Sequence, residues 1–449
     1  MSMSRSESHN RNRKRKQERL RRLLLTGGLL LAVIAVVIAA AALAGGGSSA
    51  PPDGKQSADA GSAGADDAGA GGEAGGDGAV PDNSGRGAGG DAAPGNANGE
   101  DPGQPGGTDG GTGSPAEPGT AGDGEEAEPG PVKLAFVGDL LLAASVDTLM
   151  REKGYDYPYA KALPYLQGAD LTAGNLENPI TGVHDPAEDK QFVFKGSPAS
   201  LPALKAAGFD VVSLANNHTL DHGVQGLLET MDNLDRAGIP HMGGGRNEEE
   251  AFRPVVLEAK GLKIAYFGFS RVLPVGSWKA APDRAGVAET YDERRAVRAI
   301  EEVREEADLV VVLVHWGREK ADWPVEHQKN LARAYIDAGA DLVVGAHPHV
   351  LQGFESYKGK WIAYSLGNFI FNMTPTVRTH ETGVLDATCT REGECSLQLH
   401  PMRAVASQPV PLEGEEAKAL LKRVSGLSIG ASIDEEGRIT AIADKGDRT

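Results

Sequence analysis

The stretch "GAHPHVLQG" at residues 345–353 places two histidines, His347 and His349, on either side of a proline. The residues directly before it, "DLVV" at 341–344, are typical of a buried β-strand. Imidazoles are common metal ligands, and the proline between them fixes the backbone that carries both rings. The residues that end the other strands decide whether these two histidines belong to a larger site.

Short apolar runs alternate with amphipathic stretches from Val132 onward. The apolar runs predict strands at 133–139, 169–175, 209–217, 263–270, 307–317, 340–349 and 361–371. Helical spacing of apolar residues marks 197–208, 224–238, 293–307 and 325–339. Three of these four stretches close on a glycine, the residue that most often follows a helix. Buried strands that alternate with helices predict a layered α/β domain.

The C-terminal part of the chain predicts a different arrangement. Residues 383–405 predict an antiparallel hairpin, 414–424 a helix and 437–443 a last strand. We therefore place the main domain at 131–410, with a C-terminal helix and strand appended to it at 411–449.

The chain contains only two cysteines, Cys389 and Cys395, which flank "TREGE" between the two strands of the predicted hairpin. In an oxidising compartment we expect a disulfide that clamps this hairpin. The spacing fits no zinc-site pattern, so the cysteines are interpreted as structural.

The N-terminal residues have the composition of a membrane anchor. Residues 1–22 carry nine Lys/Arg and two acidic residues, and residues 23–44 carry no charge. At a rise of ~1.5 Å per residue the uncharged stretch spans the ~30 Å hydrocarbon core of a membrane. The basic flank predicts a cytoplasmic tail, a single-pass signal anchor in the cell membrane and an extracytoplasmic remainder. The alternative is a cleaved signal peptide, because "ALA" at 42–44 resembles a cleavage site.

Residues 45–130 carry sixteen acidic and two basic residues and consist mainly of Gly, Ala, Pro, Asp and Glu. Such a segment cannot bury enough apolar surface to offset its ordering entropy, so we expect a disordered acidic linker with a reach of ~50 Å. The formal charge of the whole chain is −18, which leaves −11 on residues 131–449. Because binding to nucleic acid needs clustered Lys and Arg, no nucleic-acid partner is expected.

Five of the predicted strands end in polar residues. The set comprises Asp139; Asn175, Glu177 and Asn178; Asn216, Asn217 and His218, with Asp221 and His222 just beyond; His315 and Glu319; and His347 and His349. In parallel α/β sheets, ligands and chemistry gather beyond the carboxyl ends of the strands. We therefore expect these side chains to meet at one edge of a central sheet.

Carboxylates, imidazoles and an amide without any thiolate suit Mn²⁺, Fe or Zn²⁺ in a catalytic site. Such an ion lowers the pKa of bound water and polarises a phosphoryl or carbonyl oxygen. An imidazole beside the ligands, such as His218, protonates a leaving group. Each residue alone also has a plainer interpretation: Asp139 as a turn or helix cap, Glu177 as a solvated loop acid, 216–218 as a helix cap and His315 as a core histidine.

Several motifs in a fixed order resemble one family. They are "FVGD", "GNLENPIT", "SLANNHTLDHG", "VHWGRE", "GAHPHVLQG" and "YSLGNFIF", and they lie between about Lys133 and Phe371. They resemble the CapA proteins of capsule and poly-γ-glutamate synthesis, which in turn resemble calcineurin-like metallophosphatases. The resemblance implies a metallophosphatase-like four-layer α/β/β/α sandwich with a dinuclear metal site.

The resemblance also implies a role for each matched residue. It implies a metal-ligand set of Asp139, Glu177 in place of a bridging aspartate, Asn217, His315, His347 and His349, with His218 as the leaving-group acid. It further implies that a second set of residues contacts the substrate or supports the ligands, namely Asn175, Asn178, Lys195, Asp221, Glu319 and Asn368. The chain departs from the phosphatases after Asp139, where "DLL" puts Leu141 at the position of a ligand histidine. One ion and two ions therefore remain alternatives.

Together these features predict a membrane-anchored, extracytoplasmic, metal-dependent hydrolase or transferase that acts on an anionic polymer in capsule or poly-γ-glutamate synthesis. Leu141 favours a second hypothesis, a non-catalytic accessory protein that works with membrane subunits of a polymer synthase. A third is an exported metallophosphoesterase with another substrate. Residues 131–449 carry a net negative charge and therefore repel a polyanion at long range. Metal ions together with Lys195 or Arg318 have to offset that charge near the site.

Overall fold

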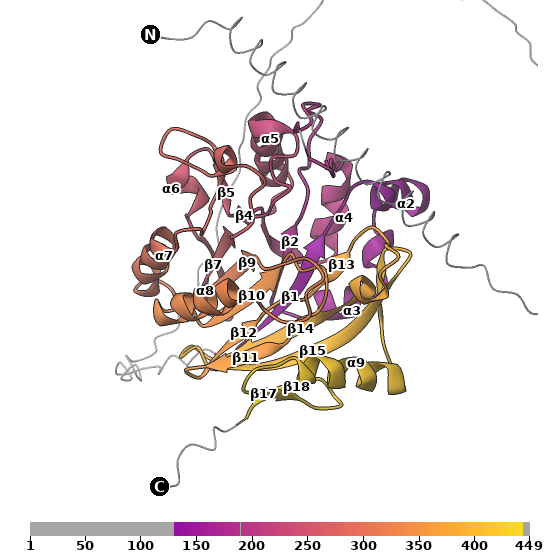
Figure 1. Ribbon diagram of the computed structural model, residues 1–449, viewed down its shortest axis with the longest axis vertical. Coiled ribbons are helices and arrows are strands. Elements are labelled where there is room, and N and C mark those ends of the chain that lie inside the picture. The colour runs from indigo at the N-terminus through magenta and orange to yellow at the C-terminus, as the bar shows by residue number, and fades with distance from the viewer. Residues whose placement is uncertain (1–129, 189, 443–449) are drawn as a thin grey trace, which may run out of the picture. The chain divides into compact units, whose positions relative to one another are not determined.

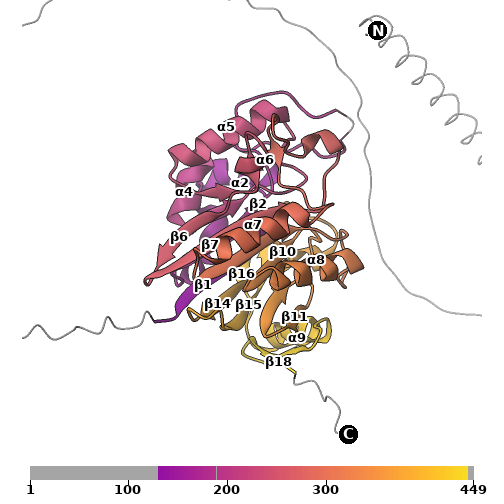
Figure 2. The same ribbon diagram turned by 90° about the vertical axis from the view of Figure 1, so that its left-hand side faces the viewer.

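The computed structural model describes residues 130–188 and 190–442, which form a mixed α/β unit (Figures 1 and 2). The predicted tail at 1–22, the anchor at 23–44 and the linker up to residue 129 lie outside the described residues. None of the helices within the described ranges is long and apolar enough to cross a membrane.

The larger of the two main sheets is built on parallel strands, namely β1 (Val132–Leu140), β2 (Leu171–Leu176), β3 (Phe209–Ser213) and β4 (His241–Met242). An antiparallel hairpin follows on the other side of β1, made of β14 (Glu381–Cys389) and β15 (Cys395–Val405). Two short strands pair off this path, β13 (Asn368–Ile370) with β1 and β16 (Gln408–Pro411) with β15.

The smaller main sheet has four parallel strands, namely β7 (Leu262–Ser270), β9 (Leu309–His315), β10 (Leu342–Ala346) and β12 (Lys360–Ala363). Its two edges are antiparallel, formed by β6 (Val255–Ala259) and β11 (Phe354–Tyr357). The strand order is β11-β12-β10-β9-β7-β6. A separate two-stranded ladder joins β5 (Gly244–Gly245) to β8 (Gly286–Val287).

Helices cover the outer face of each main sheet. The larger sheet packs against α2 (Ser145–Lys153), α3 (Leu163–Leu166), α4 (Leu201–Ala206) and α5 (Gly223–Arg236). The smaller sheet packs against α6 (Glu248–Ala251), α7 (Arg294–Arg304) and α8 (Glu326–Asp337). Figure 1 shows α4 and α5 on one side of the strands and α7 and α8 on the other. The two sheets face each other across a third apolar cluster, so the layers run helix, sheet, sheet, helix.

The β1 strand shows why its sequence is apolar at nearly every position. Leu134 and Phe136 belong to the cluster between the sheets, whereas Ala135 and Val137 belong to the cluster under the helices. A strand that is buried on both faces has no position left for a polar residue until it ends. In β1 that position is Asp139.

Residues 361–371, predicted as one strand, form parts of two different sheets. The strand β12 ends at Ala363 in the smaller sheet, and β13 begins at Asn368 in the larger one. Gly367 between them has a φ of 68°, a left-handed conformation that glycine adopts without steric cost. The prediction of a single strand was wrong because a continuous apolar run does not reveal a change of sheet.

The C-terminal segment extends the larger sheet. It forms α9 (Gly414–Gly426), β17 (Ala431–Ile433) and β18 (Arg438–Ala441), and β18 pairs with β15. The sequence predicted a single last strand here, whereas the structure has a hairpin of two. Polar residues separate these short strands, and three residues are too few to show an apolar period.

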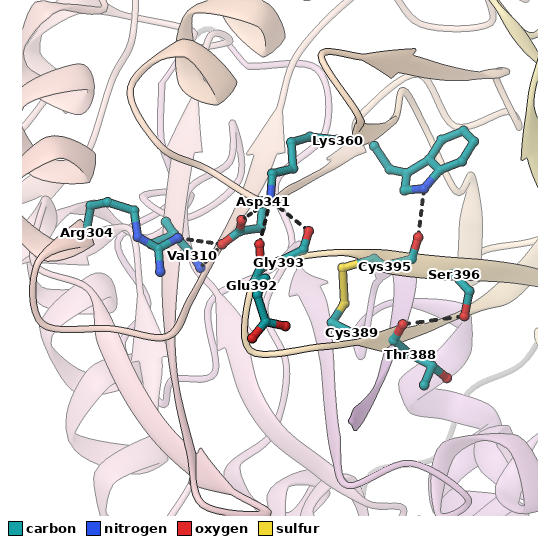
Figure 3. The surroundings of a disulfide bond; sticks show 11 residues. Arg304, Val310, Asp341, Lys360, Thr388, Cys389, Glu392, Gly393, Cys395 and Ser396 are labelled. Carbon is teal, nitrogen blue, oxygen red and sulfur yellow. Dashed lines mark hydrogen bonds and ion pairs between the residues drawn. A yellow bond between two sulfur atoms is a disulfide. The ribbon is translucent and has the colours of Figure 1, made fainter. Parts of the chain in front are cut away.

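The structure joins Cys389 to Cys395 by a disulfide directly across the β14–β15 hairpin, with 4.1 Å between the two Cα atoms. Figure 3 shows the surroundings of this bond. Lys360 Nζ donates to Gly393 O at 2.8 Å and pairs with Asp341 at 2.6 Å, and Trp361 Nε1 donates to Cys395 O at 2.9 Å. The tip of the hairpin is therefore bonded to the smaller sheet, so the disulfide lies where the two sheets meet.

Reduction of this disulfide should lower the free energy of unfolding by about 2 kcal/mol, because the bridge closes only a short loop in the unfolded chain. The measurement is chemical unfolding of the full chain with and without reductant. The double variant Cys389→Ala/Cys395→Ala is the control. Its free energy of unfolding should equal that of the reduced protein and should not change when reductant is added. An unfolding midpoint that reductant leaves in place would contradict a stabilising role.

Candidate metal centre

The polar residues that end the strands come from both main sheets. Asp139, Glu177 and Asn217 lie at or after the ends of β1, β2 and β3 in the larger sheet. His315 ends β9 in the smaller sheet, and His347 and His349 follow β10 in the same sheet. The expectation that all of them meet at one edge of a single sheet is therefore wrong. Alternation of strands and helices predicts parallel strands but does not assign each strand to a sheet.

Two groups of side chains have donor atoms within 4.8 Å of one another, one made of Glu177, His315 and His347 and the other of Asp139, Glu177 and His349. Glu177 belongs to both groups. Asn217 joins the first group, since its Oδ1 lies 2.9 Å from His315 Nε2. The six residues predicted as ligands thus lie together, in an arrangement in which one carboxylate is common to two adjacent sets.

Glu177 has the surroundings of a ligand without its cation. Its side chain is fully buried, and neither carboxylate oxygen has a hydrogen-bond partner among the described residues. The Nε2 atoms of His315 and His349 each lie 3.8 Å from its Oε1. Burial, and then the charge of Asp139, raise the pKa of Glu177 well above its usual value. A buried carboxylate without a partner is costly, and a divalent cation would supply the missing partner.

Two of the histidines are held neutral. Burial, and then the charge of His347, lower the pKa of His315 well below its usual value. Burial, and then the charge of His349, lower the pKa of His347 to about 3. The buried Nδ1 of His347 also has no hydrogen-bond partner among the described residues. Neutral imidazoles keep a free lone pair, which is the form that binds metals.

Asp139 and His349 favour each other's charged forms. Burial opposes ionisation of Asp139, yet the hydrogen bond and charge of His349 lower the pKa of this carboxyl below its usual value. Burial likewise opposes protonation of His349, but its hydrogen bond to Asp139 and the charge of that carboxylate raise its pKa. The two groups lie 3.4 Å apart, from Nδ1 to Oδ2. A cation that binds His349 therefore competes with the proton that Asp139 favours on this ring.

The backbone around Pro348 explains how the sequence "HPH" at 347–349 brings two imidazole rings together. His347 has a φ of 94° and His349 a φ of 58°, left-handed values that cost a non-glycine residue on the order of 1–3 kcal/mol. Two hydrogen bonds hold this turn, from His347 N to Asp139 Oδ2 at 3.3 Å and from Lys320 N to Pro348 O at 2.7 Å. The turn brings both rings to one side, with their centroids 5.8 Å apart.

Gly138, directly before Asp139, is required by a close approach of two strands. A Cβ at this position would collide with Gly367 O, the same atom that accepts a hydrogen bond from Asp139 N at 2.9 Å. The approach sets Asn368 opposite Asp139 in the β1–β13 register. Asn368 Oδ1 then lies 2.8 Å from His349 Nδ1, so it helps to orient that ring.

His218 follows Asn217 and has its own supporting groups. Its Nδ1 lies 2.7 Å from Asp221 Oδ2, and its ring packs on Phe194 with 4.7 Å between centroids. Its backbone N–H donates to Asn216 Oδ1 at 3.0 Å. Burial lowers the pKa of His218, although the hydrogen bond and charge of Asp221 oppose this shift. The arrangement fixes one ring nitrogen and leaves Nε2 for another partner.

Asn175 supports the ligands without being one of the six. Its Nδ2 donates to Asp139 Oδ1 at 2.8 Å and lies 3.3 Å from His315 Nδ1. Asn216 Nδ2 in turn donates to Asn175 Oδ1 at 3.1 Å. This amide chain links the ends of β1, β2, β3 and β9.

Three other predicted residues lie outside the donor groups. Asn178 Oδ1 accepts from Leu142 N at 2.7 Å, so it braces the backbone after β1. Lys195 Nζ donates to Val183 O at 3.4 Å, its one hydrogen bond within the described residues. Glu319 is exposed, and its charge adds to the rise in the pKa of Glu177. Leu141, at the position of the absent histidine, is fully buried.

Sequence reasoning missed Lys190, which reaches the site from the segment between β2 and α4. Its Nζ donates to Asn217 O at 2.6 Å and to Asp221 Oδ1, and lies 2.9 Å from His218 Nδ1. No strand or helix period marks this segment, so the sequence does not distinguish Lys190 from a surface lysine.

A sequence profile described as "Bacterial capsule synthesis protein PGA_cap" matches residues 133–373, more than half of the chain. The chain belongs to this family. The resemblance to CapA proteins that the motifs predicted is thereby confirmed.

Proteins similar in sequence to this member of the capsule synthesis family come from several bacteria. "PGA biosynthesis protein CapA" of Bacillus subtilis (strain 168) is 32% identical over 318 residues, which cover 70% of this chain and 83% of the relative. "Capsule biosynthesis protein CapA" of Bacillus anthracis is 33% identical over 285 residues, covering 62% and 69%. A "Probable polyglutamine synthesis accessory protein" of Mycobacterium tuberculosis (strain ATCC 25618 / H37Rv) is 31% identical over 235 residues, covering 48% and 59%.

Solved structures show a looser likeness. The protein TT1561 of Thermus thermophilus is 11% identical with a TM-score of 0.35, and the match covers 61% of this chain and 99% of that one. The sulfate thiohydrolase SoxB of Thermus thermophilus is 15% identical with a TM-score of 0.34, covering 63% and 49%. TM-scores this low do not bear on the activity of this protein.

Replacing the shared carboxylate should weaken metal binding. In Glu177→Gln both donor groups lose one ligand, so we expect the affinity for Mn²⁺ or Zn²⁺ to fall at least about tenfold, or ~1.4 kcal/mol. The measurement is titration calorimetry of metal-free protein, followed by metal analysis after dialysis. The matched control is Glu326→Gln on α8, whose side chain is 75% exposed and pairs with Lys329 at 3.9 Å. Equal affinities of Glu177→Gln and wild type would contradict the assignment.

Proposed function

We propose that this chain is a membrane-anchored, extracytoplasmic, metal-dependent hydrolase or transferase that acts on an anionic polymer during capsule or polyglutamate synthesis. The observation that carries the catalytic part is the fully buried Glu177, whose oxygens have no hydrogen-bond partner among the described residues and whose Oε1 lies 3.8 Å from the Nε2 atoms of His315 and His349. Family membership supports the pathway, and the composition of residues 1–44 supports the anchor.

The donor set supports Mn²⁺, Fe or Zn²⁺, because it contains carboxylates, imidazoles and an amide and no thiolate. When bound, such an ion supplies an activated water molecule and polarises the bond to be cleaved. Asp139 and Glu177 balance the positive charge, and Asn217 and the three histidines fix its position.

His218 is suited to protonate the leaving group. Its Nδ1 faces Asp221, which holds the ring in one orientation, and it directly follows the proposed ligand Asn217. A general acid of this kind contributes on the order of 10²- to 10⁴-fold to a reaction whose leaving group needs a proton. The polymer, partner subunits of a synthase and the reaction itself all belong to the proposal.

A second candidate function is that of a non-catalytic accessory protein. One observation favours it: Leu141 is fully buried where the related phosphatases carry a ligand histidine, so the group of Asp139, Glu177 and His349 has one ligand fewer. The mycobacterial relative is itself named an accessory protein. In this role the protein would hold the polymer without cleaving it.

Polymer output separates the two functions. In cells that depend on this chain, His218→Ala should lower capsule polymer production at least tenfold if the site is catalytic, because the proton donor is lost. The output is the polymer recovered from the cell surface, normalised to the amount of chain in the membrane fraction. His184→Ala, which replaces an exposed histidine, is the control and should give normal output. Normal output from His218→Ala would favour the accessory role.

A further inference from the structure

Lys190 makes an unusually complete set of contacts for a lysine on an irregular segment. Its side chain is only 12% exposed. The ammonium group donates to Asn217 O and Asp221 Oδ1 and lies 2.9 Å from His218 Nδ1. Two of its three N–H donors therefore go to Asn217 O and Asp221 Oδ1, and the ammonium lies against the ring nitrogen that faces Asp221 Oδ2.

The other side of Lys190 faces an aromatic ring and a cavity. Its Nζ lies 5.2 Å from the centroid of the Trp278 ring, which adds a cation–π contact. The two residues line a cavity of about 370 Å³, together with Leu220, Pro186 and Pro274. The lysine therefore separates this cavity from His218.

We propose that Lys190 is a positioning residue for His218: it fixes the orientation of Asp221 and of the Asn217 carbonyl, and through them the orientation of the imidazole. This inference rests on the proposed function, since it concerns how the proton donor of that reaction is held. Nothing in the sequence motifs or in the named relatives assigns a role to this lysine.

The contacts of Asp221 show how the lysine acts. Its Oδ1 accepts from Lys190, and its Oδ2 faces His218 Nδ1 at 2.7 Å and accepts from Phe194 N at 2.7 Å. Asp221 is fully buried, so it has no solvent to pair with. Without the lysine, Oδ1 would be an unpaired buried anion, and the carboxylate would have to turn or take up a proton. Either change removes the fixed partner of the imidazole.

The same contacts argue against two other roles for Lys190. A substrate-binding lysine presents its ammonium to solvent, whereas the side chain of Lys190 is only 12% exposed and donates to Asn217 O and Asp221 Oδ1. A solvated surface lysine would contribute only screened charge, whereas this one is mostly buried. Lys279 provides the contrast, because its side chain is 51% exposed and pairs with Glu289 at 3.4 Å.

Substrates whose leaving groups differ in basicity distinguish a misplaced His218 from a general loss of activity in the variant. Bis(4-nitrophenyl) phosphate releases a phenolate that needs no proton, whereas glycerophosphoethanolamine releases an alcohol that does. In the metal-loaded full chain, Lys190→Ala should lower kcat on the alkyl diester by about 10- to 100-fold and on the nitrophenyl diester by less than about threefold. Lys279→Ala is the matched control and should change neither rate.

Two further measurements test the link to His218. The double variant Lys190→Ala/His218→Ala should be no slower than His218→Ala alone, since both changes remove the same function. Added 1-propylamine, which replaces the lost side chain and can enter through the adjoining cavity, should restore Lys190→Ala saturably and leave His218→Ala unchanged.

Equal losses on both diesters, additive losses in the double variant or absence of amine rescue would each overturn the inference. If wild type cleaves neither diester, the proposed function fails for this substrate class, and the inference is decided by nitrogen-15 NMR of the histidine-labelled full chain. The Nδ1 resonance of His218 should then move in Lys190→Ala and stay in place in Lys279→Ala. An unmoved resonance in Lys190→Ala would overturn the inference as well.

Discussion

A buried carboxylate without a hydrogen-bond partner among the described residues lies where the two sheets of this protein meet. Glu177 is completely removed from solvent, and the neighbouring carboxylate of Asp139 has the same sign, so the ionised form of Glu177 is unfavourable in the absence of a cation. Removal of a carboxylate from water costs several kcal/mol unless a counter-charge is supplied. Three histidines surround it: the pKa values of His315 and His347 are lowered, and that of His349 is raised. These features have a single physical explanation if a divalent cation completes the site.

Other parts of the structure compensate for the strain of building this site. The left-handed conformations of His347 and His349 are strained, and hydrogen bonds that involve Asp139 and Lys320 offset the strain. Gly138 permits the close contact that places Asn368 beside His349. Lys360 and Trp361 tie the disulfide-closed hairpin of the larger sheet to the smaller one, so the two halves of the donor set are held by more than the core alone.

Much of the site was predictable because strand ends carry a simple signal. An apolar strand that stops at a carboxylate, an amide or an imidazole marks the rim of a sheet, and the six proposed ligands all have this context. The assignment of strands to two sheets was not predictable from periodicity, as the division of residues 361–371 between β12 and β13 shows. Lys190 was missed for another reason. Its role depends on contacts with Asn217 and Asp221 that are distant in sequence, and its own segment has no regular spacing.

The most direct test of the account is anomalous X-ray diffraction from crystals of the protein grown with Mn²⁺ or Zn²⁺, recorded at the absorption edge of the metal. The account predicts anomalous density within coordination distance of Glu177, His315 and His347, with or without a second peak beside Asp139 and His349. A featureless map at this position, with Glu177 hydrogen-bonded to a protein group instead, would contradict it.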